Sequence, residues 1–580
     1  IRDSIITGKS ASTLLTSSYL FGEDRGGVFM NQNKTNRFMP LLMALCVVIG
    51  ILIGTFYANH FSGNRLNIIN SGSSRLSNLL HIIDDQYVDS VNIDDLVEKA
   101  IPAILSELDP HSVYISAKDV QLATDDLKGS FSGVGIEFVI RDDTLRIQNV
   151  IKGGPADRAG LLAGDKIVSI NGKIFVGKGV TNEEAMHRLK GPKDSKVRIG
   201  VKRYGEQGVK ILTVTRGDVS VKSVSACYML NDSTGYIRIK SFGERTYAEM
   251  LAALQTLNIQ GADHLVIDLR DNGGGILEAA VQMANEFLPK NRLIVYTQGR
   301  KSPRVDYRSD GKGSYQHIPM VVLINEGSAS SAEIFAGAMQ DNDRATIVGR
   351  RSFGKGLVQQ QIQFPDGSMI RLTIARYYTP SGRCIQKPFK PGDNADYEND
   401  LLMRYQHGEF FSQDSIKHVG PAYHTHNGRT VYGGGGITPD IFVPEDTVNI
   451  TSYYKEAAMS GLMMQYAFNY TDRNRKKLSE FSEMRPLANY LKRQDLVSDF
   501  ADYADRNGLR RRNLMIMRSH SLLEEYLNSR IIYNMLDEQA WIEYVNLDDA
   551  TIKSALNVFR SPSILMLMPG QNTGTKRKVR

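Results

Sequence analysis

Three serines gather at a point where a hydroxyl could act as a nucleophile. Ser328, Ser330 and Ser331 lie in the segment NEGSASSAEIFAGAMQD, between a predicted strand and a predicted helix. The first backbone N–H groups of a helix have no partner within it, so they can stabilise an oxyanion that forms beside an exposed hydroxyl. The same spacing fits an ordinary serine-rich helix cap, and the residues alone leave both interpretations open.

A lysine follows in a glycine-rich segment. Residues 349–355 read GRRSFGK and match the G-x-x-x-x-G-K pattern of a phosphate-binding loop. The next residue is Gly356, where bound magnesium would need Ser or Thr, and LVQQQIQF then predicts a strand instead of a helix. Nucleotide binding is therefore a disfavoured alternative, which predicts magnesium-dependent binding of ATP.

Two closely spaced glycines form a candidate binding loop. The segment GVGI, Gly133–Ile136, opens a predicted strand. Its N–H groups can converge on a carboxylate, and a free edge of the strand can take an extended peptide as an added strand. A plain glycine turn is the alternative explanation of this short pattern.

The elements that must position these residues alternate between strands and helices. Over residues 225–445, the strands GYIRIKSF, HLVIDLR, MVVLIN and TIVG alternate with helical runs, which is typical of βαβ units and a mostly parallel sheet. Residues 131–219 instead show short strands and one helical patch, for which Thr181 is the expected N-cap. The polar, glycine-rich stretch 387–436 predicts a surface insertion.

The middle of the strand-rich region carries a recognisable pattern. Asn149–Lys173 reads NVIKGGPADRAGLLAGDKIVSINGK and closely resembles the central stretch of PDZ domains. The resemblance implies a mainly-β module that binds the free C-terminus of a peptide. Its carboxylate-binding loop would comprise Gly133, Val134, Gly135 and Ile136.

Three segments in a fixed order resemble the C-terminal processing peptidases, which are also called tail-specific or carboxyl-terminal proteases. They are DLRDNGGG, NEGSASSAEI and GRRSFGKGLVQ, and TPSGRCIQ and GGGITPDI extend the resemblance over residues 74–445. The family comprises serine endopeptidases with a Ser-Lys dyad and an inserted PDZ domain. The resemblance implies an α/β multidomain fold, with a crotonase/ClpP-like βαβ protease core and an inserted mainly-β PDZ domain.

The resemblance also implies roles for individual residues. The nucleophile would be the second serine of its motif, Ser330, and the general base would be Lys355, 25 residues later. Gln359 matches a supporting glutamine found in part of the family. On a strand, four residues span about 13 Å, so contact between Gln359 and Lys355 needs a bend or long side chains that fold back.

The oxyanion hole implied by the family pattern combines two backbone N–H groups. One belongs to Ser331, and the other belongs to Gly273 or Gly274, between which the pattern does not choose. Ser331 replaces the commoner alanine, which should be harmless because only its N–H is needed. Asp341 matches an aspartate important for activity in some relatives, and a polar residue at a helix C-terminus is the equal alternative.

A lysine base must lose its proton near neutral pH. Its reference pKa near 10.4 has to fall by about three units for that. Burial without a carboxylate partner lowers the pKa of a lysine. Gly354 and Gly356 flank Lys355, which is consistent with close packing around it.

An uncharged stretch predicts a membrane helix. Residues 40–58 read PLLMALCVVIGILIGTFYA, and nineteen residues of helix span roughly 28 Å, close to a hydrocarbon core. Lys34 and Arg37 precede it, so the positive-inside rule places most of the chain outside the cytoplasm. A buried core helix and a cleaved signal are the alternatives, and Phe56 at the −3 position fits cleavage poorly.

The chain therefore divides into six predicted regions. They are a leader 1–37, an anchor 38–58, an N-terminal helical region 74–127, a PDZ domain 128–219, a protease core 225–445 with the insertion 387–436, and a helical C-terminal extension 449–580. Within the leader, residues 1–29 precede Met30 and are expected to be upstream translation.

Composition excludes several classes of protein. A chain of 580 residues is too long for one ordinary domain, and 42% hydrophobic and 23% charged residues are typical of globular proteins. Three cysteines exclude a disulfide scaffold. The net charge of +7 comes from mixed charges without zinc-finger, RNP or basic-zipper spacing, so no nucleic-acid partner is expected. No cluster has metal-ligand spacing, so no metal or other cofactor is expected.

The sequence predicts a bacterial serine endopeptidase, anchored by one transmembrane helix in the inner membrane with its catalytic part in the periplasm. Its expected partners are the membrane and protein substrates with free apolar C-termini. Export after signal cleavage is the alternative location. An inactive PDZ scaffold on a protease-like fold is the alternative function, although the presence of both Ser330 and Lys355 argues against it. The substrate, a homo-oligomeric state and the role of residues 449–580 are left open.

Overall fold

The computed structural model describes residues 43–51, 72–141, 143–177, 179–418 and 420–561, in two compact units, 1–96 and 97–580. In the first unit, residues 43–51 are helical and α2 spans Gly72–Gln86. The leader 1–37 and residues 38–42 and 52–58 of the predicted anchor lie outside the described residues. Among the residues that are described, no helix is both long enough and apolar enough to cross a bilayer.

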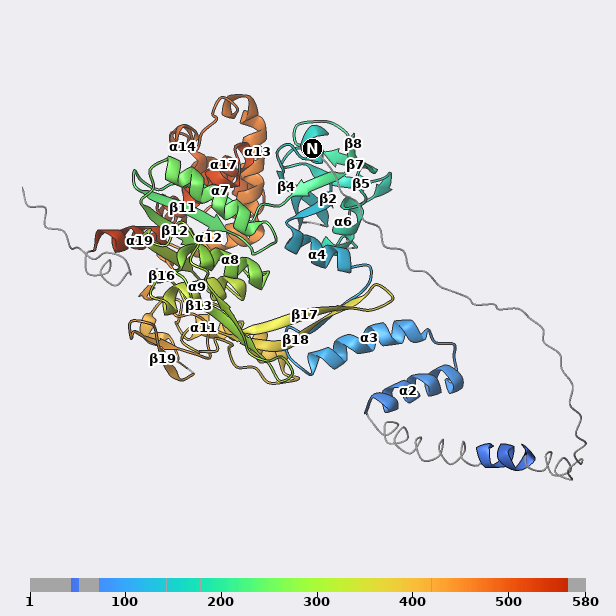
Figure 1. The fold of residues 1–580 in the computed structure, drawn as a ribbon. Helices are drawn as coiled ribbons and strands as arrows, with labels where there is room; N and C mark the ends of the chain where they lie inside the picture. Colours follow the sequence, from blue (N-terminus) through green and yellow to red (C-terminus); the bar gives the residue numbers. More distant parts are fainter. Residues whose placement is uncertain (1–42, 52–71, 142, 178, 419, 562–580) are drawn as a thin grey trace, which may run out of the picture. The chain divides into compact units, whose positions relative to one another are not determined.

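The second unit is built around a six-stranded sheet, shown in Figure 1. Its strands, in spatial order, are β10 (Val224–Met229), β11 (Thr234–Ile239), β12 (His264–Asp268), β15 (Met320–Ile324), β16 (Thr346–Gly349) and β21 (Ile441–Phe442). All neighbours are parallel except the pair β10 and β11. The predicted βαβ core is confirmed. Because parallel strands end at the same edge, the segments that follow β12 and β15 meet there.

Helices cover both faces of this sheet. One face packs against apolar residues of α7 (Thr246–Ile259), α8 (Leu277–Phe287) and α9 (Ser331–Asp341). The other face packs against α18 (Glu538–Val545) and α19 (Ala550–Arg560) of the C-terminal extension. The extension therefore completes the core of the catalytic region.

A second, antiparallel sheet was not predicted. It comprises β1 (Val113–Ile115), β18 (Met369–Tyr378), β13 (Leu293–Gln298) and β14 (Val305–Arg308), and β17 (Leu357–Gln363) also pairs with β18. The strands β17 and β18 form a hairpin directly after Lys355. The insertion 387–436 contains α10 (Asn394–Glu398), α11 (Asp400–Gln406), a 3₁₀ turn (Gln413–Ser415), β19 (Ala422–His424) and β20 (Thr430–Tyr432).

The PDZ module is preceded by α3 (Ile93–Ser106) and α4 (Val120–Lys128). Its sheet has the order β3 (Ile136–Arg141), β4 (Thr144–Val150), β5 (Lys166–Ile170), β7 (Lys196–Lys202) and β8 (Lys210–Thr215), and β6 (Lys173–Ile174) pairs with β5. Its helices are α5 (Pro155–Arg158) and α6 (Asn182–Leu189), and the N–H of Glu184 donates to Thr181 Oγ1 at 3.1 Å, which confirms the predicted cap. The strands β2 (Ser130–Gly133) and β9 (Gly217–Ser220) pair where the chain enters and leaves the module, as an inserted domain requires.

The remaining helices of the extension have an apolar core of their own. They are α12 (Ser452–Ser460), α13 (Leu462–Leu478), α14 (Met484–Leu491), α15 (Leu496–Arg506), α16 (Asn513–Arg518) and α17 (His520–Met535). The helical character predicted for residues 449–561 is confirmed.

Candidate active site

The structure distinguishes the three serines between β15 and α9. Ser328 is fully buried, and its hydroxyl donates to the carbonyl oxygen of Leu269 at 2.7 Å. The hydroxyl of Ser331 donates to the carbonyl oxygen of Gly275 at 2.9 Å. Within the described residues, Ser330 is the one of the three whose hydroxyl donates no hydrogen bond, and it is only half-buried. Geometry therefore leaves Ser330 as the candidate nucleophile.

Ser330 has an uncommon backbone conformation. Its φ is +55°, in a region that residues with a side chain rarely adopt. Such strain persists where the surroundings enforce it, and it concentrates at functional sites. Here it follows from a sharp turn between a buried strand and the first residue of α9.

Lys355 lies in the loop between β16 and β17 and is half-buried. Burial lowers its pKa, and the positive charge of Arg371 lowers it further, while the carboxylates of Glu333 and Asp109 oppose the shift. Among the described residues, its ammonium group forms no hydrogen bond or ion pair. These are the surroundings that the sequence analysis required of a lysine base.

A buried carboxylate joins the turn between β15 and α9 that carries Ser330, the serine turn, to the loop between β16 and β17 that carries Lys355, the lysine loop. Glu333 Oε2 accepts the N–H of Ser330 at 2.8 Å and the N–H of Lys355 at 2.9 Å. Its other oxygen accepts the hydroxyl of Ser352 at 2.5 Å and the N–H of Gly354 at 2.8 Å. Burial raises the pKa of Glu333 to about 7 in spite of these donors. Two segments far apart in the sequence are thus fixed on one side chain.

Tyr377 of β18 makes a second connection between the same two segments. Its hydroxyl lies 3.1 Å from the carbonyl oxygen of Ser330 and also hydrogen-bonds the carbonyl oxygen of Lys355. The sequence analysis missed both Glu333 and Tyr377. For Glu333, a signal was present, because a glutamate three residues after a serine is typical of a reciprocal helix cap. No local signal marks Tyr377.

The structure also separates the two candidate glycines of the oxyanion hole. The N–H of Gly274 already donates to Asn272 Oδ1 at 2.8 Å. Among the described residues, the N–H groups of Gly273 and Ser331 have no acceptor. Gly274 has a φ of +97°, and a Cβ atom there would lie 2.6 Å from Ser330 Cβ, so this position requires glycine for close approach. Gly273 and Ser331 are therefore the available donors.

Two of the proposed supporting residues lie away from the dyad. Gln359 follows a β-bulge in β17, and its amide donates to Thr373 Oγ1 at 3.4 Å rather than to Lys355. Thr373 in turn donates to Asp109 Oδ1 at 3.0 Å. Asp341 is fully buried and forms an ion pair of 2.7 Å with Arg383, so it holds the TPSGR turn.

A half-buried histidine whose pKa responds to the charge of Lys355 was also missed. A ring nitrogen of His111 lies 2.8 Å from the hydroxyl of Tyr397. Burial and the nearby charge of Lys355 lower the pKa of His111 to about 4, so the imidazole is neutral at physiological pH. His111 lies more than two hundred residues before Lys355 in the sequence, so spacing could not associate them.

Most residues of the insertion 387–436 are exposed or half-buried, as predicted, but some of its charged side chains are buried against the lysine loop. Arg404 is 5% exposed and donates to the carbonyl oxygens of Ser352 and Arg351, at 3.1 and 2.8 Å. Glu409, which is also buried, pairs with both Arg404 and Arg351. Buried ion pairs compensate the cost of burying these charges, and the insertion thereby supports the loop that carries Lys355.

The PDZ loop Gly133–Ile136 runs from the end of β2 to the start of β3. In the part of the chain that the structure describes, β3 pairs with β4 alone, so its other edge is unpaired there. Gly135 has a φ of +79°. Among the described residues, the N–H groups of Val134 and Gly135 have no acceptor, whereas their carbonyl oxygens accept from Ala156 and Ile151. The loop can therefore present donors to a carboxylate next to a free strand edge.

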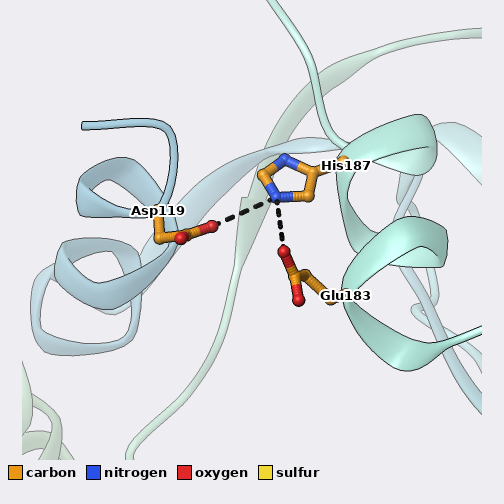
Figure 2. A group of neighbouring side chains, drawn as sticks. All are labelled: Asp119, Glu183 and His187. Atoms are coloured by element: carbon orange, nitrogen blue, oxygen red, sulfur yellow. Dashed lines mark hydrogen bonds and ion pairs between the residues drawn. The ribbon is translucent and has the colours of Figure 1, made fainter. Parts of the chain in front are cut away.

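The fold brings together one group of polar side chains that spacing did not reveal, shown in Figure 2. His187 Nε2 lies 3.2 Å from Asp119 and 3.9 Å from Glu183. Lys118 pairs with the same glutamate at 3.4 Å. Asp119, Glu183 and His187 have the ligand types that could hold a metal ion. The ammonium group of Lys118, however, already supplies a positive charge beside this partly exposed cluster.

Three segments of the chain match models of known protein families. Residues 233–397 match Peptidase family S41, residues 123–202 match the PDZ domain, and residues 453–537 match a family of unknown function. A carboxy-terminal-processing protease of Bartonella bacilliformis is 39% identical over 319 residues, which are 54% of this chain and 72% of the relative. A CtpA-like serine protease of Staphylococcus aureus is 30% identical over 370 residues, 63% of this chain and 73% of the relative.

Among solved structures, the photosystem II D1 C-terminal processing protease is similar to this chain. The two are 30% identical, the match covers 54% of this chain and 89% of that chain, and the TM-score is 0.32.

Proposed function

Since this chain belongs to peptidase family S41, and is thus a serine peptidase with a PDZ domain, we propose that it processes the C-terminal ends of proteins with Ser330 as nucleophile and Lys355 as general base. The observation that carries the proposal is the pair of connections through Glu333 and Tyr377. These hold the backbone of both residues in one place, although the residues belong to different loops.

The proposed reaction begins with proton transfer from Ser330 to the neutral amine of Lys355. The serine oxygen then bonds to the scissile carbonyl carbon, and the carbonyl oxygen becomes an oxyanion. The N–H groups of Ser331 and Gly273 donate to that oxyanion, and preorganised donors of this kind contribute strongly to catalysis. The ammonium of Lys355 returns the proton to the departing amine, and Lys355 then activates the water that hydrolyses the acyl-enzyme.

Peptide recognition is proposed to begin at the PDZ loop. The unpaired N–H groups of Val134 and Gly135 would receive the terminal carboxylate of the substrate, together with the N–H of Ile136 at the start of β3. The peptide would then extend along the free edge of β3 as an added strand. The supporting role of Gln359 is proposed to be indirect, through Thr373 and Asp109.

The location is proposed from the sequence. The uncharged stretch 40–58 behind Lys34 and Arg37 favours a single anchor with residues 59–580 in the periplasm. Membrane fractions of the producing cell test this: an anchored protein resists alkaline extraction and is digested by protease added to the periplasmic side. Complete release by alkali would favour export with cleavage instead.

The catalytic assignment is tested by a matched pair of serine variants. Ser330→Ala should abolish peptide cleavage and leave the melting temperature almost unchanged, because its hydroxyl donates no hydrogen bond. Ser328→Ala should retain most of kcat but lose about 1–3 kcal/mol of stability, since the buried groups of Leu269 and Asn325 lose their partner. Cleavage retained by purified Ser330→Ala would exclude the mechanism.

A further inference from the structure

The C-terminal extension contacts the strands that lead into the site, including β12, which precedes the oxyanion turn, the turn of residues 271–275 that carries Gly273. Ile542 of α18 and Ile552, Ala555 and Val558 of α19 join an apolar cluster with strands β12, β15 and β16. These are the strands whose C-terminal ends carry the oxyanion turn, the serine turn and the lysine loop. The extension therefore supports the framework of the site from the face opposite α7, α8 and α9.

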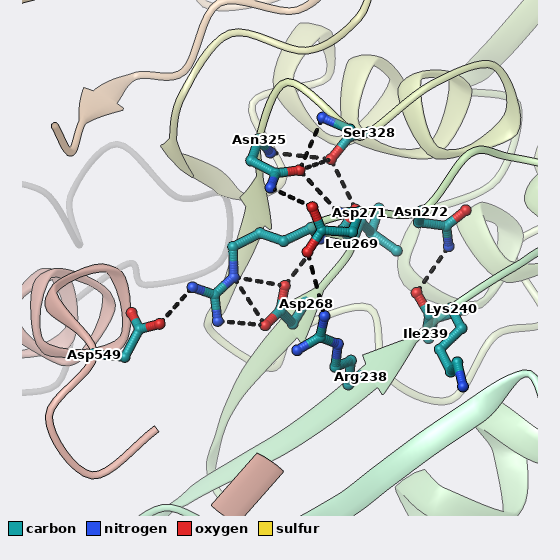
Figure 3. A network of polar contacts seen from close by, with 12 residues as sticks. Arg238, Ile239, Lys240, Asp268, Leu269, Asp271, Asn272, Asn325, Ser328 and Asp549 are labelled. Atoms are coloured by element: carbon teal, nitrogen blue, oxygen red, sulfur yellow. Dashed lines mark hydrogen bonds and ion pairs between the residues drawn. The ribbon is translucent and has the colours of Figure 1, made fainter. Parts of the chain in front are cut away.

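One ion pair connects the extension to the turn that carries Gly273. Asp549 caps α19: its Oδ1 accepts the N–H groups of Thr551 and Ile552 at 2.7 and 2.9 Å. Its Oδ2 accepts the guanidinium of Arg270 at 2.6 Å. Asp549 approaches this network from the side of the C-terminal helices in Figure 3.

Arg270 is mostly buried and is held on its other side by Asp268. Its guanidinium donates to Asp268 Oδ2 at 2.6 Å, and its backbone N–H donates to Asp268 Oδ1 at 2.9 Å. Two carboxylates thus fix both the side chain and the backbone of Arg270. The next residues form the oxyanion turn, so the position of Arg270 sets where that turn begins.

The oxyanion turn is then tied to the serine turn. The N–H of Asp271 donates to Asn325 Oδ1 at 2.8 Å, and the N–H of Ala329 donates to the carbonyl oxygen of Asn272 at 2.9 Å. A displacement of Arg270 would therefore move the N–H of Gly273 relative to Ser330. Asp549 is thus one polar contact through which the extension reaches the catalytic geometry, besides the apolar cluster behind the sheet.

A preceding helix of the extension contacts the peptide-binding strand of the PDZ module. The hydroxyl of Tyr533, on α17, donates to Glu137 Oε2 at 2.5 Å and accepts the amide of Asn149 at 3.3 Å. Glu137 is the second residue of β3, next to the carboxylate loop. Tyr533 also packs edge-on against Trp541 of α18, with ring centroids 5.9 Å apart. Helix α18 therefore lies between the helix that carries Tyr533 and the helix that Asp549 caps.

We propose that the C-terminal extension is a positioning element that holds the oxyanion turn through Asp549 and the tail-binding strand β3 through Tyr533, so that tail binding at β3 affects the rate of cleavage. Tyr533 lies within residues 453–537, which match a family of unknown function, and Asp549 lies beyond that match. The part that concerns tails rests on the proposed function. The part that concerns Asp549 needs only peptidase activity.

The test of the first contact is Asp549→Asn. Asparagine is an equally good helix cap, so α19 keeps its N-terminus while Arg270 loses its charged partner. We expect kcat to fall about 3- to 30-fold with KM within twofold, the range typical of residues that act through others. Asp537→Asn is the control, because Asp537 caps α18 in the same way through the N–H of Ala540 and contacts no arginine in the described part of the chain.

A second measurement separates positioning from general loss of stability. Arg270→Gln and the double variant Arg270→Gln/Asp549→Asn complete a double-mutant cycle on kcat. If the two residues act as a unit, the double variant should be no slower than Arg270→Gln alone. If the fold losses of kcat in the two single variants multiply in the double variant, the residues act independently and the proposal is wrong. Equal losses of kcat in Asp549→Asn and Asp537→Asn would also overturn it.

The second contact is tested with Tyr533→Phe, which removes only the hydroxyl. The ratio of kcat/KM for a peptide with a free C-terminus to that of its amide should fall at least threefold, while cleavage of the amide stays unchanged. Tyr526→Phe, on the same helix, should leave the ratio as it is. An unchanged ratio in Tyr533→Phe would overturn the coupling. Activity surviving in Ser330→Ala would instead contradict the proposed mechanism and not the positioning.

Discussion

At Lys355, three charged residues act on one ammonium group. Arg371 and burial lower its pKa, while Glu333 and Asp109 raise it. Lysine acts as a base only when it is neutral, so kcat/KM should rise with pH and level off above the pKa of Lys355. The charges around the lysine therefore set the lower end of the working pH range.

Replacement of Arg371 tests this directly. Arg371→Gln removes a positive charge, so the pKa of Lys355 should rise and the acid limb of the kcat/KM profile should move to higher pH by roughly half a unit to one unit. Arg376→Gln on the same strand is the control and should leave the limb in place. A shift to lower pH, or an equal shift in both variants, would contradict the assignment of Lys355 as the base.

Glu333 gives a second prediction at the residue scale. Its carboxylate accepts four donors, and Glu333→Gln would place an amide NH₂ against two of them. Each buried N–H left without an acceptor costs about 1–3 kcal/mol, and the serine and lysine loops should lose their alignment. We expect a large fall in kcat, while Glu278→Gln at the exposed start of α8 should stay close to wild type.

The pH dependence of stability should also differ between Glu333→Gln and the wild-type chain. Burial raises the pKa of Glu333 from 4.5 to about 7, so between these values the folded chain binds a proton that the unfolded chain has released. This group therefore makes the free energy of unfolding decrease as pH rises from about 4.5 to 7. In denaturant titrations at several pH values, the free energy of unfolding of Glu333→Gln should not show this decrease. The same pH dependence in Glu333→Gln and wild type would contradict the raised pKa of Glu333.

At the scale of elements, the PDZ module should sort substrates by their ends. Two or three N–H donors to a carboxylate give charge-assisted bonds worth roughly 1.5–3 kcal/mol, and burial of an apolar last residue adds about 1.5–3 kcal/mol. Once the entropy cost of ordering the bound peptide is subtracted, kcat/KM for a peptide ending in Ala or Val should be tenfold to a thousandfold higher than for its C-terminal amide. Equal kcat/KM values would remove tail recognition and leave the serine chemistry intact.

Two other elements have roles that their composition did not suggest. The segment 387–436 looks like a solvated insertion, yet Arg404 and Glu409 are buried behind the lysine loop. The hairpin of β17 and β18 supplies Tyr377, whose hydroxyl contacts the backbone of both dyad residues. In each case, polar side chains are buried because they satisfy backbone groups of a neighbouring loop.

At the scale of the whole molecule, four segments far apart in the chain form one catalytic region. The oxyanion turn, the serine turn and the lysine loop follow three neighbouring strands, and α18 and α19 close the sheet behind them. The PDZ module contacts α17 of the C-terminal extension through Tyr533, and the catalytic core contacts the cap of α19 through Asp549. Removing the extension should therefore affect folding of the core as well as its regulation.

The sequence by itself determined the βαβ core, the PDZ module and the candidates Ser330 and Lys355. These depend on local periodicity and on motifs in a fixed order, which short stretches of chain encode. It could not choose between Gly273 and Gly274, because both have the same residue type and the choice depends on which N–H is already bonded inside the turn. That choice required the tertiary structure.

The tertiary structure alone also decided which side chains hold the site together. Glu333, Tyr377, Arg404 and Asp549 each act on residues between 22 and 279 positions away. No periodicity or spacing marks such pairs, since hydrogen bonds and ion pairs form between whatever groups the packed strands and helices bring within about 3 Å. The motifs identify the two residues of the proposed dyad, and the folded chain decides how they are aligned.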